Sequence, residues 1–281
     1  MATGLYKLIC SGNEDIDHKT IVDFLNNNDL DHETRQRVSL WADEFKFWND
    51  SRALYPYMEI GAPFRVLADT VKSFMKPQDG DTWLDAGCGP ARMSEFLWEK
   101  SNRKINKIYG LDIILWPAQE MAKKLPALEL KYGNLGERLD FADNTFDGIV
   151  CNLVLPYMIE YEGIKGKEGI QRIFNEFARV LKPGGRLIWS TIFKGLHCEI
   201  VLACAVPGVI KVLYKMPNIP IIAFKLYKYG KVLERKGRQG LYSFLSIQEW
   251  DSMLQNAGFI NSEWKSVFIE QAMVNSCILR K

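Results

Sequence analysis

Two glycines and an acid form the most chemically informative pattern in the sequence. Asp85 ends a short apolar run, and Gly87 and Gly89 follow it directly before a stretch with helical spacing. Glycines at such a turn let the backbone approach a ligand closely, and turns of this kind lie where parallel sheets bind ligands. A Gly-x-Gly pair alone is common, so the surrounding residues decide what it indicates.

The side chains around the turn distinguish between classes of ligand. A dinucleotide-binding turn has a third glycine that leaves the helix N-terminus to a pyrophosphate, but Arg92 stands there. Asp85 would repel a pyrophosphate, whereas it suits a ligand with an ammonium group and a positive sulfonium. Asp112 ends a second apolar run, where a carboxylate can accept hydrogen bonds from both ribose hydroxyls of an adenosine or cap the next helix. The pattern favours S-adenosylmethionine over a nicotinamide dinucleotide.

These residues require a framework of alternating strands and helices. From Asp81 onward, short apolar runs alternate with amphipathic stretches, which is typical of a parallel sheet with helices on both faces. The predicted strands are Thr82–Ala86, Lys107–Asp112, Glu129–Tyr132, Phe146–Asn152 and Arg186–Thr191, and the predicted helices between them are Ala91–Lys100, Pro117–Lys124 and Gly169–Leu181. A helix that starts at a capping box, Ser246 to Glu249, should follow.

The last two β-type runs, Ile260–Ile269 and Ala272–Leu279, are so close in sequence that they must pair as an antiparallel hairpin. The predicted fold class is therefore α/β, a doubly wound, mostly parallel seven-stranded sheet that ends in an antiparallel hairpin. Residues 1–75 are predicted to form a helical N-terminal extension. Residues 76–281 should form the main domain, with a lid insertion at 194–241.

Five motifs occur in an order and spacing that resemble the class I S-adenosylmethionine-dependent methyltransferases. The strongest resemblance covers roughly residues 80–192 and is to the branch that includes quinone-biosynthesis and natural-product enzymes. The motifs are Asp85-Ala86-Gly87-Cys88-Gly89, Asp112, Gly133-Asn134, the stretch from Leu139 to Asp147, and Leu181-Lys182-Pro183-Gly184-Gly185. The resemblance implies a Rossmann-like methyltransferase fold and a cofactor that becomes S-adenosylhomocysteine.

The resemblance also implies roles for single residues. Asp85, Gly87, Cys88 and Gly89 should hold the methionine part of the cofactor. Asp112 and Ile113 should contact the ribose, and Asn134 and Leu135 the adenine. Asn152 should border the methyl group. Two positions depart from the family pattern, because family members often have an acid in place of Asn134 and a glycine in place of Ala91. The carbonyl oxygen of Asn134 can still accept a hydrogen bond from the adenine amino group.

Methyl transfer is an in-line displacement that needs no covalent enzyme group, and a base matters only if the nucleophile must lose a proton. His197 and Tyr157 are the candidate catalytic residues, although each could be an ordinary surface or packing residue. Tyr55, Tyr57 and Tyr161 are the candidate substrate contacts. We expect a small, lipophilic or aromatic acceptor with an oxygen, carbon or nitrogen nucleophile.

Other functions fit the sequence less well. An Asn-Pro-Pro-Tyr-like motif, expected for amide and nucleobase methylation, is replaced by Asn152-Leu153-Val154-Leu155. No metal is expected, because His197, Cys198 and Cys204 match no standard zinc spacing. Two alternatives remain: a cofactor-binding but inactive regulatory subunit of a partner methyltransferase, and a nicotinamide-dependent oxidoreductase.

Charge and composition limit the partners. A net charge of +2 gives no field that would attract nucleic acid. Six cysteines without a C-x-x-C pair, and the lack of a signal-peptide pattern, predict a cytoplasmic protein. Residues 205–240 combine eight Lys or Arg with one acid and many apolar residues. This segment is predicted to cover the acceptor, to contact a membrane surface peripherally, or simply to pack on the domain.

Overall fold

The computed structural model describes residues 18–58, 60–161 and 164–280. Its contacts divide the chain into two compact units, Met1–Pro56 and Tyr57–Lys281.

The described part of the first unit consists of helices. Helix α2 (His18–Asn27) is followed by α3 (His32–Ser51), a short 3-10 turn η1 (Arg52–Leu54) and the start of α4 (Tyr55–Met58). Asp31 begins α3 by accepting hydrogen bonds from the backbone N–H and the hydroxyl of Thr34, at 2.8 and 2.7 Å. Arg35 of α3 donates to the carbonyl oxygen of Leu25 in α2, which ties the two helices together.

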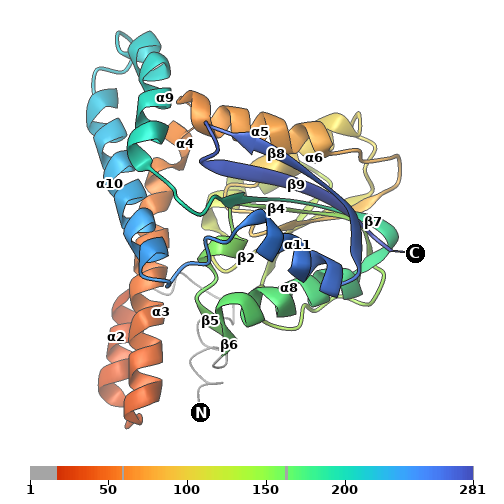
Figure 1. The fold of residues 1–281 in the computed structure, drawn as a ribbon, viewed down its shortest axis with the longest axis horizontal. Helices are drawn as coiled ribbons and strands as arrows, with labels where there is room; N and C mark the ends of the chain where they lie inside the picture. Colours follow the sequence, from red (N-terminus) through yellow and green to blue (C-terminus); the bar gives the residue numbers. More distant parts are fainter. Residues whose placement is uncertain (1–17, 59, 162–163, 281) are drawn as a thin grey trace. The chain divides into compact units, whose positions relative to one another are not determined.

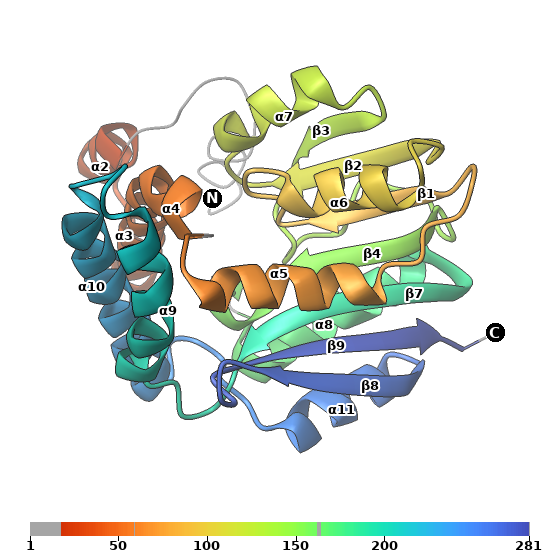
Figure 2. The same cartoon turned by 90° about the horizontal axis from the view of Figure 1, so that it is seen from above.

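The second unit contains a seven-stranded sheet with the order β3-β2-β1-β4-β7-β9-β8 (Figures 1 and 2). The strands β1, β2, β3, β4 and β7 are parallel, and β9 pairs antiparallel with both β7 and β8. The strands span Thr82–Ala86 (β1), Lys107–Asp112 (β2), Leu128–Tyr132 (β3), Phe146–Asn152 (β4), Leu181–Ile192 (β7), Phe259–Val267 (β8) and Ala272–Leu279 (β9). The predicted fold class is confirmed.

Helices cover both faces of this sheet (Figure 1). One core joins residues such as Trp83 and Ile188 to the helices on one face, and the other joins Leu84 and Leu187 to the helices on the opposite face. The first face carries α5 (Ala62–Phe74), α6 (Arg92–Lys100) and α7 (Gln119–Lys124), and the second carries α8 (Gly166–Val180) and α11 (Ile247–Asn256). Strand residues therefore alternate with a period of two between two dry cores.

Helix boundaries follow local chemistry. The capping box of α11 is present, since the Ser246 side chain accepts from the Glu249 backbone and the Glu249 side chain accepts from the Ser246 backbone. The predicted helix Pro117–Lys124 is divided into the 3-10 turn η2 (Trp116–Ala118) and α7. Pro117 is tolerated in this first turn because its missing N–H would have no partner there.

The main boundary differs from the one expected between residues 75 and 76. Helix α5 belongs to the second unit, where Leu67, Val71 and Phe74 are buried in the core against the sheet. The sequence predicted that the N-terminal segment is helical. Only tertiary contacts reveal that its last helix completes one face of the sheet.

The insertion after β7 is a helical hairpin of α9 (Cys198–Val212) and α10 (Ile219–Arg238). It is fastened to the start of α5, where Gly61 faces Ala205 and a Cβ atom on Gly208 would lie 2.3 Å from the carbonyl oxygen of Ile60. Within the described ranges, no helix combines the length and the hydropathy needed to cross a membrane.

Candidate active site

The glycine turn lies over the carboxyl ends of β1 and β2. Gly87 has a φ of +74°, and a Cβ atom at this position would lie 2.4 Å from the Val154 side chain, which follows β4. The backbone N–H groups of Gly87 and Cys88 both donate to the carbonyl oxygen of Leu111, at 2.7 and 3.0 Å. Glycine is therefore required here by the backbone conformation and by the contact with the β4 end.

Asp112 is part of the same turn. Its Oδ2 atom accepts from the Gly89 backbone N–H and its Oδ1 atom accepts from the Ile114 backbone N–H, each at 2.9 Å. The side chain is buried but lies at the strand end, as the sequence predicted. Because an ionised carboxylate offers about four acceptor positions, these two bonds are compatible with bonds to a diol. Ile113, the next residue, is half-buried.

Asp85, the last but one residue of β1, lies in a much drier environment. Its carboxylate is 1% exposed, and Oδ2 accepts both the backbone N–H and the hydroxyl of Ser94, at 2.9 and 2.6 Å. Burial raises the pKa of Asp85 to about 7; the hydrogen bonds from Ser94 lower it and the nearby charge of Asp112 raises it. Ser94 is the third residue of α6, so Asp85 ties the helix N-terminus to the strand. Sequence reasoning missed Ser94, since a serine in the first turn of a helix is common.

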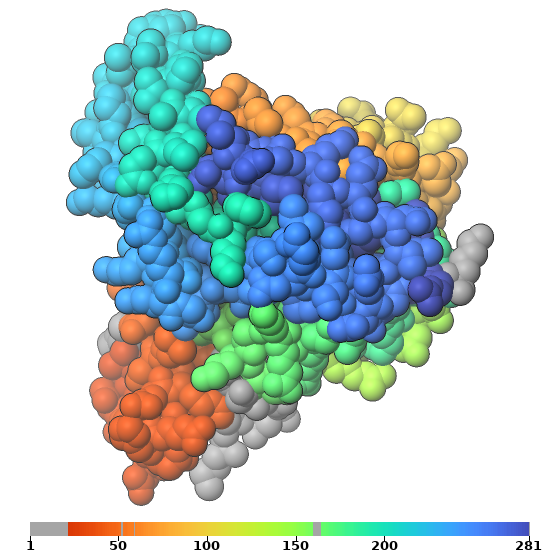
Figure 3. Space-filling view, viewed as in Figure 1, coloured from red at the N-terminus to blue at the C-terminus, as the bar shows by residue number. Residues whose placement is uncertain are grey.

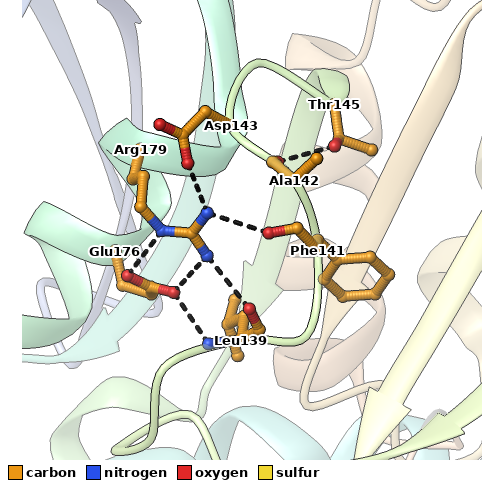
Figure 4. A network of polar contacts seen from close by, with 7 residues as sticks. All are labelled: Leu139, Phe141, Ala142, Asp143, Thr145, Glu176 and Arg179. Atoms are coloured by element: carbon orange, nitrogen blue, oxygen red, sulfur yellow. Dashed lines mark hydrogen bonds and ion pairs between the residues drawn. The ribbon is translucent and has the colours of Figure 1, made fainter.

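The loop after β3 carries the residues expected to meet adenine. The side-chain oxygen of Asn134 accepts from the Gly136 backbone N–H at 2.8 Å, and both Asn134 and Leu135 are buried. Arg179 of α8 holds the rest of this loop (Figure 4). It donates to the carbonyl oxygens of Leu139 and Phe141 and pairs with Asp143 and Glu176, and Glu176 in turn accepts from the Leu139 backbone N–H.

The contacts of Arg179 also change the pKa of its side chain. The hydrogen bonds that the Arg179 guanidinium donates, first to Glu176 and then to Asp143, raise its pKa above the ordinary value. The sequence motif from Leu139 to Asp147 marks this loop, but Arg179 was missed because it lies on another element.

The end of β4 is joined to β7 through a serine. Ser190 donates its hydroxyl proton to Asn152 Oδ1 at 2.7 Å and accepts from the Leu153 backbone N–H at 2.9 Å. Leu153 has a φ of +54°, so the chain turns sharply here. Ser190 therefore orients the Asn152 amide at the carboxyl edge beside the glycine turn.

Tyr157 lies in an aromatic group that the sequence did not predict. Its ring makes edge contacts with Tyr242 and Phe244, with centroids 5.1 and 6.3 Å apart. The Ser243 backbone N–H donates to the carbonyl oxygen of Pro156 at 2.8 Å. The segment that leaves α10 therefore packs against the turn that follows β4.

His197 lies at the base of the helical hairpin. Its backbone N–H donates to Gln271 Oε1 at 2.6 Å, and its exposed imidazole comes within 4.8 Å of side-chain oxygens of Glu199 and Glu234. Lys231 Nζ lies 2.8 Å from Glu199 and 2.9 Å from Glu234. Together these residues resemble a metal-ligand set, but Lys231 already forms an ion pair with both carboxylates.

The three tyrosines expected to contact the acceptor lie in different parts of the chain. Tyr57 is half-buried in the second unit. Tyr55 belongs to the first unit, and Tyr161 lies in the short strand β5 (Glu160–Tyr161), with its side chain outside the described residues. Their contact with an acceptor stays a prediction.

Comparison with known proteins agrees with this geometry. Residues 84–189 match the methyltransferase domain family. The chain is 29% identical over 201 residues to a demethylmenaquinone methyltransferase of Listeria welshimeri, which covers 68% of this chain and 75% of that protein.

Two solved structures share the fold. A chain from the complex of the Haloferax volcanii Trm112 methyltransferase activator and a methyltransferase is 15% identical, with a TM-score of 0.58 and coverage of 85% of this chain and 97% of that one. Phosphoethanolamine N-methyltransferase 2 of Haemonchus contortus, in complex with S-adenosyl-L-methionine, is 11% identical, with a TM-score of 0.54 and coverage of 85% and 57%. Residues 84–189 thus match a methyltransferase domain, and the chain shares the Rossmann-like fold of the class I S-adenosylmethionine-dependent methyltransferases.

Proposed function

We propose that this chain binds S-adenosylmethionine at the carboxyl edge of β1, β2 and β4 and transfers the methyl group to a small lipophilic or aromatic acceptor. The observation that carries the proposal is the pair of buried acids, Asp85 and Asp112, beside the glycine turn. Two acids suit a cationic ligand with a ribose and disfavour a pyrophosphate. Similarity to a demethylmenaquinone methyltransferase supports a quinone-like acceptor.

In this proposal each side of the crevice holds one part of the cofactor. Asp112 accepts the ribose hydroxyls, with Ile113 beside it, and Asn134 with Leu135 borders the adenine. Asp85 attracts the ammonium group of the methionine part, mainly through charge, because one of its oxygens is already bonded to Ser94.

The backbone of Gly87, Cys88 and Gly89 forms the floor under the methionine part of the cofactor. Gly87 and Gly89 both have positive φ, a conformation that glycine adopts without strain, and their lack of a side chain lets the ligand approach the backbone closely.

When bound, S-adenosylmethionine supplies a methyl group on a positive sulfur, which keeps the electron pair of the broken bond as the bond between acceptor and methyl group forms. Asn152 and Tyr157 border the transfer and keep water away from it. Positioning of this kind can contribute on the order of 7–11 kcal/mol. His197 is the candidate base for an acceptor that must lose a proton, and it would have to reach the acceptor from the hairpin base.

The cofactor site is tested by changing Asp112. Replacement by Ala should weaken S-adenosylmethionine binding by about 1.5–3 kcal/mol, the scale of hydrogen bonds to a charged group. The affinity of Asp112→Asn, which keeps one acceptor oxygen, should lie between the affinities of Asp112→Ala and the parent. Titration calorimetry measures both, with circular dichroism to verify folding and the exposed Asp140→Ala as the matched control. Unchanged affinity in a folded Asp112→Ala protein would refute the ribose assignment.

The acceptor is tested by separate assays. We expect methyl transfer to demethylmenaquinone or its quinol, and little transfer to short polar catechols. Tight cofactor binding without transfer to any acceptor would instead support the alternative of an inactive regulatory subunit.

A further inference from the structure

The helical hairpin exposes apolar side chains that helices normally bury. Helix α9 is apolar on nearly all sides, yet Cys198 is its only buried residue. Helix α10 buries only Ile219 and Glu234. A helix with apolar residues all round usually lies in a core or a membrane. The described part of the chain therefore leaves this surface without an apolar partner.

The exposed apolar residues gather at the end of the hairpin, which we call the tip and define as residues 206–228. Six of the nine large hydrophobic side chains exposed in the described residues lie there, so the exposure is concentrated on one element. They are Val206 (44% exposed), Ile210 (64%), Leu213 (43%), Tyr214 (79%), Ile221 (61%) and Phe224 (55%). The tip projects beyond α5, away from the sheet of the second unit (Figures 1 and 3).

Charge along the hairpin is separated into two regions. No acid occurs between Glu199 and Glu234, and both acids lie at the base, where Lys231 bridges them. Arg238 also pairs with Glu234. The tip carries four exposed lysines, none of which has an acidic partner among the described residues: Lys211, Lys215, Lys225 and Lys228. The tip is therefore both apolar and cationic, while the base is neutralised.

We propose that the tip docks peripherally on an anionic lipid surface. The aliphatic and aromatic side chains enter the boundary between headgroups and acyl chains, and the lysines meet lipid phosphates. Tyr214, the most exposed of the six, is suited to the interface because it has an apolar ring and a polar hydroxyl. This inference rests on the hairpin surface alone, so it holds whether or not the acceptor is lipophilic.

Charge argues against a second copy of the chain as the occupant. Pairing of two tips would bring their lysines together with no acid to compensate them, and like charges repel at such an interface. A polyanion without hydrocarbon would leave Ile210 and Ile221 in water and would gain nothing from them. A lipid surface satisfies both kinds of side chain.

Flotation with vesicles tests the proposal. The full chain should bind vesicles of phosphatidylcholine mixed with phosphatidylglycerol at low salt, and binding should weaken as salt rises. Binding to phosphatidylcholine alone should be much weaker, since each lysine near an anionic surface contributes about fivefold.

Two variants separate the contributions. Replacement of Lys211, Lys215, Lys225 and Lys228 by Gln should lower binding at least about tenfold and remove its salt dependence. Ile210→Ser combined with Ile221→Ser should lower binding but keep the salt dependence. The matched control replaces four exposed lysines elsewhere in the same unit by Gln, Lys100, Lys104, Lys123 and Lys124, and should bind as the parent does.

The outcomes distinguish this inference from the proposed function. Cofactor affinity in solution should be the same in the parent and the tip variants, so a loss of vesicle binding does not report on the active site. No vesicle binding by the parent would overturn the proposal, as would equal loss in the control. Concentration-dependent dimers in sedimentation that are abolished by the isoleucine changes, without vesicle binding, would show self-association instead.

Discussion

Asp85 and Asp112 show how two acids at neighbouring strand ends acquire different properties. Asp112 accepts two backbone N–H groups at the rim of the turn, whereas Asp85 is sealed beneath α6 with Ser94. Burial raises the pKa of Asp85 to about 7, which places its titration near neutral pH. A cation bound nearby would favour the ionised form of Asp85. The two residues are therefore suited to different parts of the same ligand.

The Asp85 environment predicts a dependence of stability on pH. The folded-state pKa of about 7 exceeds the ordinary value of 3.8, so the folded state binds more protons between these values. The contribution of this group to the free energy of unfolding is therefore present at pH 4 and is lost as pH rises through 7. Asp85→Asn removes this titration, and its stability relative to the parent should rise by up to about 4 kcal/mol across this range.

Urea unfolding of the protein without cofactor, at intervals from pH 4 to 8, measures this difference. The exposed Asp140→Asn serves as control and should follow the parent at every pH. A stability difference between Asp85→Asn and the parent that stays constant with pH would contradict the assigned cause.

At the scale of elements, the loop between β3 and β4 depends on α8. Arg179 and Glu176 make contacts with four groups of this loop, and both side chains are largely buried (Figure 4). The loop begins with Asn134 and Leu135, which border the proposed adenine site. Helix α8 thus holds the loop that carries the proposed adenine site, although α8 follows this loop in the sequence.

Arg179→Met keeps the aliphatic stem but removes the guanidinium. We expect a loss of about 3 kcal/mol in the free energy of unfolding, because two carbonyl oxygens and Glu176 lose their partner. Cofactor affinity should fall as well. Denaturation and calorimetry measure the two effects, and Arg138→Met, an exposed arginine of the same loop, is the matched control. Equal effects of the two substitutions would show that charge alone, rather than the network, is responsible.

At the scale of the whole molecule, the division between Pro56 and Tyr57 predicts what can fold alone. A chain of residues 57–281 retains α5 and both cores of the sheet, so it should fold and keep its cofactor affinity. A chain that begins at residue 76 loses the buried face of α5 and should be unstable. Circular dichroism and calorimetry on the two truncated chains test this prediction. If the longer one fails to fold, the N-terminal unit is needed for the core.

Much of the candidate cofactor site could be located from sequence because its signals are local. The strands were predicted from short apolar runs, and Asp112 and Asn152 are the last residues of their strands while Asp85 is the last but one of β1. The glycine turn and the capping box at Ser246 also depend on residues close in sequence. Because parallel strands bring their carboxyl ends to one edge, the strand pattern also predicted that these residues are neighbours.

Only the tertiary structure decided which side chains support the residues of the candidate cofactor site. Ser190 lies 37 residues from Leu153, and Arg179 lies on a helix distant in sequence from the loop it holds. Tyr242 and Phe244 meet Tyr157 because the chain returns from α10 to the end of β4. The sequence also shows that the hairpin of α9 and α10 is apolar and basic in composition. Which of its side chains are exposed is decided by packing. Periodicity is a property of neighbours along the chain, whereas contact and burial are properties of the folded whole.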